Sequence, residues 1–479
     1  MRHRVSYVHT AAHAAPIKFA NASYVELAPD LFVAREDRYT VAVQPYSHVK
    51  AVRIQISRPS LATPPHAAAA RQSGVFAYEF QAGVHVYAVP QATVGPHEQA
   101  EFYAQLNALL GLVLGVSVAP QEWVRSVDSF YWHAPGAPQP QVAQVPQLPR
   151  AWDALDYYYS AAQLTVSTLD ADLRALSVAA AGCEYTEVGV FEVLARSSRD
   201  DVVLSGARVV MDPTDPDAHA APVHQTLFHV KPRHRHLAQH AAVDLRANGL
   251  HPVLEMARIP DPPRDADVLA CKLYGYLTLG KSVFLDPYQV PARLEVVANY
   301  GVRDLELPAY AVLQWGNEVL VEMEAGAGDW NLTLHSRYQL PSTTQTHTDV
   351  SVDKPVLFYA CDVTSDAVLL QNSPFDTRRE LGGSFERFFT DDTVFYHLLD
   401  RGTSSVRIPN ACGSKASVSL ATVVALVLGL IVVMLKVCRK WRQPECSCER
   451  RDGGLCRCDT ALCKRRGPSP HVSSTKKEE

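Results

Sequence analysis

The order of apolar and polar residues along the chain predicts two kinds of element. The first is an uncharged stretch of twenty residues, 416–435, in which thirteen side chains are Val, Leu, Ile or Met. A helix of that length rises by about 30 Å, which matches the hydrocarbon thickness of a bilayer. The stretch shows no amphipathic face of the kind that packs a helix onto a soluble core. We therefore expect a membrane-spanning helix over 416–435.

The second kind of element is the β-strand, indicated by apolar residues at every second position. Strand-like runs are 39–43, 52–56, 76–80, 84–86, 164–166, 187–191, 202–204, 207–210, 269–277, 283–290, 311–313, 318–323, 332–338 and 355–361. Another apolar run, 105–118, is too short to span a membrane, and we interpret it as a buried helix or a strand pair. The pattern predicts a mainly β fold, with antiparallel β-sandwich domains followed by a single C-terminal transmembrane helix.

Proline-rich sequence suggests how the chain divides before the span. Residues 134–150 contain five prolines, which favour polyproline II and cannot build a core. We interpret this stretch as a linker or long loop at a domain boundary. It separates an N-terminal β-rich region, 1–133, from a middle β-rich region, 151–265. A third β-rich domain, 266–412, precedes the span, and a cysteine-rich tail, 436–479, follows it.

The distribution of charge predicts the orientation of the span. From Lys436 onward twelve Lys and Arg stand against six Asp and Glu, a net charge of +6. The residues before Lys436 carry −11, which leaves the chain at −5. Basic residues beside a span stay in the cytosol, so we expect the tail inside and residues 1–415 in a lumen or outside. The acidic part offers no basic face to nucleic acid, whereas the basic tail suits an anionic leaflet.

Sequons and cysteines fit a lumenal position for residues 1–415. Asn21 and Asn331 lie in glycosylation sequons, whereas proline excludes the sequon at Asn372. The cysteines before the span are Cys183, Cys271, Cys361 and Cys412. A lumen permits disulfides among these four thiols, and three pairings are possible.

The chain ends carry targeting information. Lys476 and Lys477, third and fourth from the C-terminus, resemble the dilysine retrieval signal of endoplasmic reticulum membrane proteins. The first twenty residues include basic side chains but no apolar core of seven to fifteen residues, so we expect no cleavable signal peptide.

No motif in the chain favours catalysis. Asp170 with Asp172, and Asp265 with Asp267, form Asp-x-Asp pairs of the kind that some glycosyltransferases use to hold a metal, but neither adjoins a phosphate-binding loop. The histidine-rich stretch 231–240 has the composition of a solvated basic loop, and no Gly-x-Ser-x-Gly elbow occurs. We expect no catalytic residue, no cofactor and no metal site.

Four polar residues are candidates for contact with a partner protein. His335 and Arg337 share the polar face of the strand 332–338, where a charge-assisted contact within the sheet, for example to Asp362, is the alternative. Asp391 and Asp392 lie in a Thr-Asp-Asp-Thr sequence that we expect to cap a short helix carrying Phe395 and Leu398.

Short sequence motifs near the C-terminus resemble the PIG-X family. They are FLDPY at 284–288, LELP at 305–308, LHSRY at 334–338 with Pro341-Ser342, and VLFYACD at 356–362. SPF at 373–375, FFTDDT at 388–393 and His397-Leu398 are similar to the longer fungal branch of the family, the Pbn proteins. The match covers about 271–409 and precedes a single span, as in the family.

This resemblance implies a function that composition alone does not. It implies a non-catalytic lumenal subunit of glycosylphosphatidylinositol mannosyltransferase I, anchored once in the endoplasmic reticulum membrane. Such a subunit stabilises a multi-span catalytic partner, similar to PIG-M, that adds the first mannose to the anchor precursor. For the fungal branch it implies a wider part in the stability of reticulum proteins. Alternatives are a general folding factor, the transferase itself and a cell-surface receptor.

Overall fold

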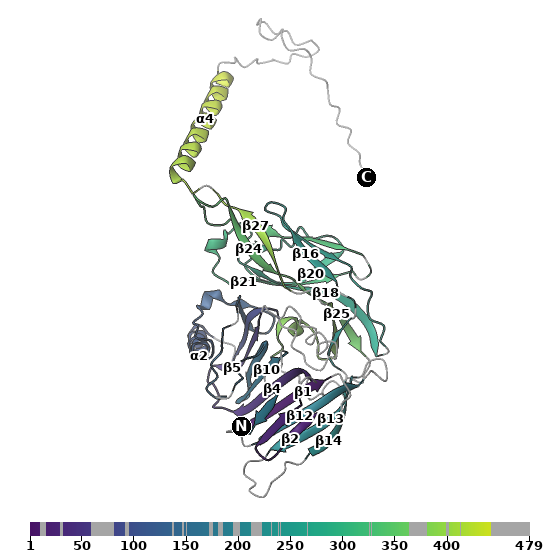
Figure 1. The fold of residues 1–479 in the computed structure, drawn as a ribbon. Helices are drawn as coiled ribbons and strands as arrows, with labels where there is room; N and C mark the ends of the chain where they lie inside the picture. The colour runs from purple at the N-terminus through teal and green to yellow at the C-terminus, as the bar shows by residue number, and fades with distance from the viewer. Residues whose placement is uncertain are drawn as a thin grey trace, which may run out of the picture. The chain divides into compact units, whose positions relative to one another are not determined.

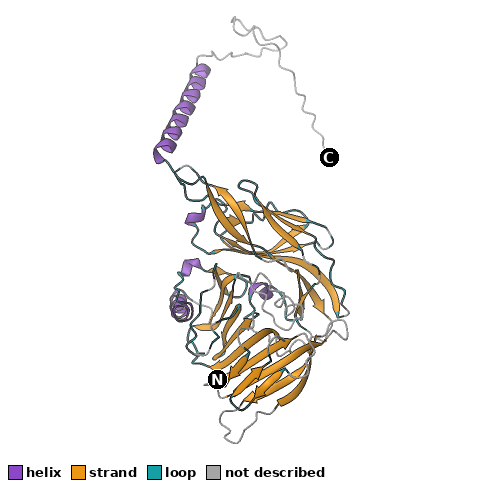
Figure 2. Ribbon diagram, in the orientation of Figure 1, coloured by secondary structure: helices purple, strands orange, loops and turns teal. Residues whose placement is uncertain are grey.

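The computed structural model divides the chain into two compact units, Met1–Ala411 and Cys412–Glu479. It describes all residues except 10–15, 29–31, 59–80, 92–94, 137, 146–147, 150, 172–175, 181–184, 195–201, 212–222, 231, 238, 240, 266, 325, 327, 364–380, 399–401, 412 and 442–479. Strands predominate in the first unit, as Figure 2 shows, so the prediction of a mainly β fold is confirmed.

Residues 1–230 contribute one sheet of eleven strands to the first unit (Figure 1). In spatial order the strands are β14 (Val223–Val230), β13 (Val202–Met211), β12 (Tyr185–Leu194), β1 (Arg2–His9), β4 (Phe32–Ala42), β10 (Gln163–Asp170), β9 (Ala154–Ser160), β5 (Val49–Ser57), β6 (Gly83–Pro90), β8 (Phe130–Ala134) and β7 (Val124–Arg125). The pair β1–β12 is parallel and the other pairs are antiparallel.

A helix covers part of one face of this sheet. The helix α2 (Pro96–Leu114) begins with a proline, and the Glu98 carboxylate accepts a hydrogen bond from the Gly95 N–H at 2.8 Å. Its buried face includes Phe102 and Leu106, which pack into the same core as Ile54 of β5. The run 105–118 therefore lies partly in a buried helix, one of the two alternatives that the sequence left open.

A small sheet covers another part of the eleven-stranded sheet. Its strands are β11 (Ser177–Ala179), β3 (Tyr24–Leu27) and β2 (Ile17–Ala20). Val25 and Leu27 of β3 share a core with Val5 and Tyr7 of β1. Since side chains alternate along a strand, the neighbouring residues of the large sheet point to its opposite face.

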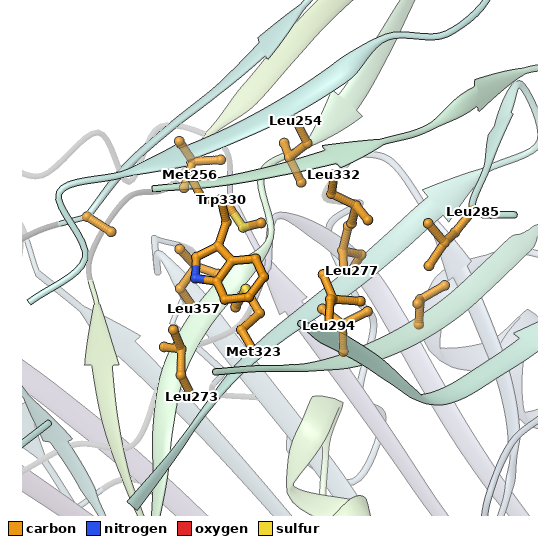
Figure 3. Packing of buried hydrophobic residues seen from close by; sticks show 14 of the residues in the cluster. Leu254, Met256, Leu273, Leu277, Leu285, Leu294, Met323, Trp330, Leu332 and Leu357 are labelled. Carbon is orange, nitrogen blue, oxygen red and sulfur yellow. The ribbon is translucent and has the colours of Figure 1, made fainter. Parts of the chain in front are cut away.

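Residues 234–409 build a sandwich with one core between its layers. One layer is a six-stranded sheet of β15 (His234–His236), β26 (Thr393–Leu398), β25 (Val356–Val363), β18 (Val268–Gly280), β21 (Gly316–Met323) and β20 (Leu294–Gly301). Facing it are β16 (Ala242–Arg246), β17 (Val253–Ala257) and β22 (Trp330–Thr333), with the pairs β19 (Val283–Phe284)–β23 (His335–Ser336) and β24 (His347–Asp353)–β27 (Thr403–Pro409). Figure 3 shows Met256 and Trp330 of the smaller layer packed against Met323 and Leu357 of the larger one.

The strand order corrects the predicted domain boundaries. Strands β8 and β9, on either side of residues 134–150, belong to one sheet, so the proline-rich stretch is a loop inside the first unit, with Val142 and Val145 buried. The predicted middle region, 151–265, is shared between two structures. Its strands β9, β10, β12, β13 and β14 belong to the eleven-stranded sheet and β11 to the small sheet that covers it, whereas β15, β16 and β17 belong to the sandwich. Pairing between distant strands decides this division, and composition does not report it.

Three local predictions are wrong. The expected strand 311–313 does not form: Ala311 ends the 3-10 turn η2 (Ala309–Ala311), and residues 312–313 have no regular secondary structure. The turns η1 (Pro120–Glu122) and η4 (Ser384–Phe388) are of the same kind. Residues 393–398 form β26 and no helix, because both faces of this apolar segment are buried in the sheet. The histidine-rich stretch contains β15, in which His234 and Arg235 are 6% and 4% exposed, so it is not a solvated loop.

The described part of the second unit contains the helix α4 (Lys415–Trp441), which includes the predicted span 416–435. Within the described residues it is the one helix long and apolar enough to cross a membrane. Its last turn carries Arg439 and Lys440. One C-terminal apolar helix of this kind is compatible with a single-pass membrane protein.

Candidate functional site

Three of the motifs that carry the family resemblance meet at Arg337. Its Nη1 donates hydrogen bonds to the carbonyl oxygens of Asp304 and Leu307, at 2.7 and 2.8 Å. The guanidinium carbon lies 4.4 Å from the ring centroid of Phe284. Arg337 thereby joins the motifs at 284–288 and 334–338 to the loop that carries LELP.

His335 belongs to the same buried cluster. Its Nδ1 lies 3.1 Å from the Nδ1 of His251, and its ring stacks on Phe284. Burial, and then the neighbouring His251, lower the pKa of His335, which favours the neutral ring. His335 and Arg337 are 8% and 3% exposed, and the contacts described here are internal to the first unit. Backbone carbonyls, and not Asp362, accept the hydrogen bonds of Arg337.

Asp391 and Asp392 lie in a different environment, on an exposed turn between η4 and β26. Arg233 supports this turn from inside, because its Nη2 and Nε donate hydrogen bonds to the carbonyl oxygens of Thr390 and Thr393, each at 3.0 Å. The turn is therefore ordered by the protein and presents two carboxylates at the surface. Their contact with a partner stays a prediction.

The second Asp-x-Asp pair holds an arginine. Two nitrogens of Arg235 donate to the two carboxylate oxygens of Asp267, at 3.1 and 2.6 Å, and the hydroxyl of Tyr396 donates to Asp265. Of the first pair, Asp170 is 7% exposed and Asp172 lies outside the described residues. In the described part of the chain, no group of three or more His, Cys, Asp or Glu is placed to hold a metal ion.

Two histidines and a glutamate form another buried cluster. The Nδ1 of His234 lies 2.9 Å from the Nε2 of His397, and its Nε2 lies 3.1 Å from Glu386. Burial, and then His234 and His236, lower the pKa of His397. Burial opposes the ionisation of Glu386, but the hydrogen bond and charge of His234, with Arg53 and Arg233, outweigh it and lower the pKa of Glu386 to about 2.

Glu386 belongs to a segment, 381–389, that contacts both large sheets; Figure 1 shows η4, drawn in green, between them. On one side, Arg53 of β5 donates to the Leu381 carbonyl at 3.1 Å, and the Tyr87 hydroxyl accepts from the Ser384 N–H at 2.9 Å. On the other side, Phe385 stacks on Phe358 of β25, with ring centroids 4.0 Å apart.

This segment lies close to β5 at Gly383. A Cβ atom at Gly383 would come within 2.3 to 2.5 Å of the terminal amide of Gln55, so a larger residue there would require the Gln55 side chain to move. None of the contacts of 381–389 was foreseen from the sequence.

The structure selects one of the possible disulfides. Cys271 and Cys361 are paired residues on the antiparallel strands β18 and β25, and they are joined by a disulfide. Cys183 and Cys412 lie outside the described residues, and Cys438 on α4 is free and exposed. A disulfide persists in an oxidising compartment, which fits the expected lumenal position.

The two sequons differ in structure. Asn331 is exposed on β22, at the edge of its three-stranded sheet. The Asn21 side chain instead accepts hydrogen bonds from the N–H groups of Ser23 and Tyr24, at 2.9 and 2.7 Å, and thereby stabilises a turn. Lys476 and Lys477 lie outside the described residues.

Comparison with known proteins gives a consistent result. A model of the PIG-X / PBN1 family matches residues 247–438. The chain is similar to Protein PBN1 of Debaryomyces hansenii, with 31% identity over 414 residues, 84% of this chain and 88% of the relative. It is also similar to Protein PBN1 of Candida albicans, with 32% identity over 454 residues, 85% of this chain and 90% of the relative. The solved structure BspA_C_mut, at a TM-score of 0.13 and 8% identity, is too dissimilar to inform the fold.

Proposed function

The chain belongs to the PIG-X / PBN1 family, and on this basis we propose that it is a non-catalytic subunit of glycosylphosphatidylinositol mannosyltransferase I. Its body lies in the lumen of the endoplasmic reticulum and stabilises a multi-span catalytic subunit similar to PIG-M, which adds the first mannose to the anchor precursor. The observation that carries this proposal is the family relationship over 84–85% of the chain.

Two structural features support a lumenal body on a single anchor. The helix α4 is long and apolar enough to span a bilayer and has basic residues in its last turn, which favours a cytosolic C-terminus. The Cys271–Cys361 disulfide requires an oxidising compartment to persist.

An accessory role is supported by the contacts of the candidate polar side chains, which bind other residues of the same chain. The carboxylates of Asp265 and Asp267 are bound to Tyr396 and Arg235, and His335 and Arg337 hold loops of the sandwich together. These side chains are used to order the protein. The exposed carboxylates of Asp391 and Asp392 are the surface groups that we assign to contact with the catalytic subunit.

Depletion of the protein tests the proposal directly. We expect the level of the mannosyltransferase to fall while its transcript stays constant, with loss of the first mannose on the anchor precursor. An unchanged enzyme level together with lost transfer would instead indicate a catalytic role. Broad loss of other reticulum proteins with intact mannosylation would favour the general folding factor.

The partner contact is tested by replacing two surface carboxylates. The double variant Asp391→Asn/Asp392→Asn should lower the amount of catalytic subunit that co-purifies. Glu101→Gln on the exposed face of α2 is the matched control and should leave it unchanged. Equal recovery with the double variant and the control would remove Asp391 and Asp392 from the interface.

Location and topology are tested in cells and sealed microsomes. Protease added outside should remove the tail and spare residues 1–411, and digestion of the body would refute the lumenal assignment.

Lys476→Ser with Lys477→Ser should move part of the protein to later secretory compartments. Retention of the double variant in the reticulum would show that these lysines are not its retrieval signal.

A further inference from the structure

Apolar side chains are exposed beside the place where the chain leaves the sandwich. Tyr310, Tyr338 and Leu340 are 57%, 64% and 65% exposed. The Ala309 N–H donates to the Tyr338 carbonyl at 3.0 Å, which places the η2 turn next to the segment 338–340. We call Tyr310, Tyr338 and Leu340 the exit surface.

The loop that follows Leu340 is fastened to the end of the sandwich. The Ser342 N–H donates to the Ala411 carbonyl at 3.1 Å, and the Asn410 N–H donates to the Thr346 carbonyl at 2.9 Å. The Ser342 hydroxyl also accepts from the N–H of Gln345 at 2.9 Å, which orders the loop itself. The exit surface is thus tied to Ala411, the last residue of the first unit.

Only a short piece of chain separates Ala411 from the membrane helix. Lys415, the first residue of α4, is four positions further on, and four residues reach at most about 14 Å when fully extended. Leu340 is two residues from Ser342, a further reach of about 7 Å. Chain connectivity alone therefore keeps Leu340 within roughly 25 Å of the start of the span, whatever the orientation of the first unit.

The chemistry of this surface matches a bilayer interface. Residues 338–346 contain no charged side chain, and their exposed members are Tyr, Leu, Pro, Thr and Gln. Tyrosine is enriched at the level of lipid headgroups, where its ring lies in the apolar zone and its hydroxyl stays hydrated. From this surface and its tether we infer that Tyr310, Tyr338 and Leu340 contact the headgroup region of the lumenal leaflet beside the anchor.

This contact attaches the body to the membrane at a second point, in addition to the anchor α4. A single helix joined through three residues, 412–414, leaves the body free to tilt, whereas an apolar surface in the headgroup region restricts the orientation of the body relative to the bilayer. The contact depends on α4 as the membrane anchor, and it does not depend on the proposed transferase partner.

Site-specific photo-crosslinking in microsomes tests the inference. The photoreactive residue p-benzoylphenylalanine replaces Tyr338 or Leu340 in the full-length chain, and the irradiated protein is purified and analysed by mass for covalently bound phospholipid. Position 227 on β14 is the matched control, since Leu227 is 58% exposed in the eleven-stranded sheet. We expect at least fivefold more lipid adduct at positions 338 and 340 than at 227.

Two results would overturn the inference. One is lipid labelling at 338 and 340 no higher than at 227; the other is a protein adduct as the main product, which would make the exit surface a protein interface. Each replaced side chain is exposed, so the fold should tolerate the change. Retention of the Cys271–Cys361 disulfide on a non-reducing gel verifies this for every variant.

Discussion

The guanidinium of Arg387 forms a salt bridge with the carboxylate of Glu318, and both side chains are completely buried. Glu318 also accepts a hydrogen bond from the Tyr276 hydroxyl at 2.7 Å, and Arg387 donates to the Ser129 hydroxyl at 2.8 Å. Glu318 and Tyr276 belong to the sandwich, whereas Ser129 precedes β8 of the eleven-stranded sheet. The pair therefore links the two large sheets through the segment 381–389.

Breaking this pair should destabilise the first unit strongly. Arg387→Met leaves Glu318 buried without its cation, and the expected loss is about 3–5 kcal/mol of unfolding free energy. The measurement is denaturant unfolding of the purified full-length chain in detergent, followed by tryptophan fluorescence. The double variant Arg387→Met/Glu318→Met should lose less than Arg387→Met alone, because it leaves no unpaired charge. An equal or larger loss would contradict a dominant charge effect.

Removal of the disulfide should also weaken the sandwich. Cys271 and Cys361 are 90 residues apart in sequence, and a bridge that closes a long loop contributes about 2–5 kcal/mol. We expect the Cys271→Ser/Cys361→Ser variant to unfold at a lower denaturant concentration than the parent protein. The unfolding midpoint of this variant should be the same with and without a reducing agent. Cys438→Ser on α4 is the control and should match the parent protein in both measurements.

The environment of Glu386 predicts a pH dependence with a definite sign. Its pKa is lowered from 4.5 to about 2 in the folded protein, so its ionised form stabilises the fold above about pH 4.5. That contribution decreases as the pH falls from about 4.5 towards 2. The difference in unfolding free energy between the parent and Glu386→Gln should therefore be largest near neutral pH and shrink towards pH 3. A difference independent of pH would show that the charge of Glu386 is not what stabilises the fold.

Arg337 should be needed to hold the LELP loop. Arg337→Met loses the hydrogen bonds to the carbonyls of Asp304 and Leu307, each worth about 1.5–3 kcal/mol when the donor is charged. We expect faster proteolytic cleavage within 302–308 and a lower unfolding free energy. Arg293→Gln is the control, since its salt bridge with Glu324 is exposed and worth at most about 1 kcal/mol.

Glycosylation provides a further measurement of topology. Asn331 is exposed on an edge strand, so Asn331→Gln should remove one endoglycosidase-sensitive shift in gel mobility. Asn372→Gln should have no effect, because Pro374 occupies the third position of the triplet, where a sequon requires Ser or Thr. An unchanged mobility of Asn331→Gln would show that this sequon is not used.

Local sequence patterns were sufficient for the apolar helix, for part of the strands and for the family. An uncharged and mostly apolar run of twenty residues indicates a helix long and apolar enough to cross a bilayer, and alternation in segments such as 52–56 predicts a strand without knowledge of its neighbours. The motifs near Arg337 were likewise sufficient to identify the PIG-X / PBN1 family, which the comparisons confirm. The sequence also provided the candidate residues, but not their surroundings.

Tertiary structure alone decided which of those residues are buried and what they contact. Arg387 and Glu318 are 69 residues apart, and Arg53 meets the Leu381 carbonyl across 328 residues, so no local pattern reports either contact. The pairing of Cys271 with Cys361, 90 residues away, is likewise not indicated by any local pattern. Charged side chains of this kind are usually assigned to the surface from sequence, because their burial is favourable only where a distant partner compensates for lost hydration.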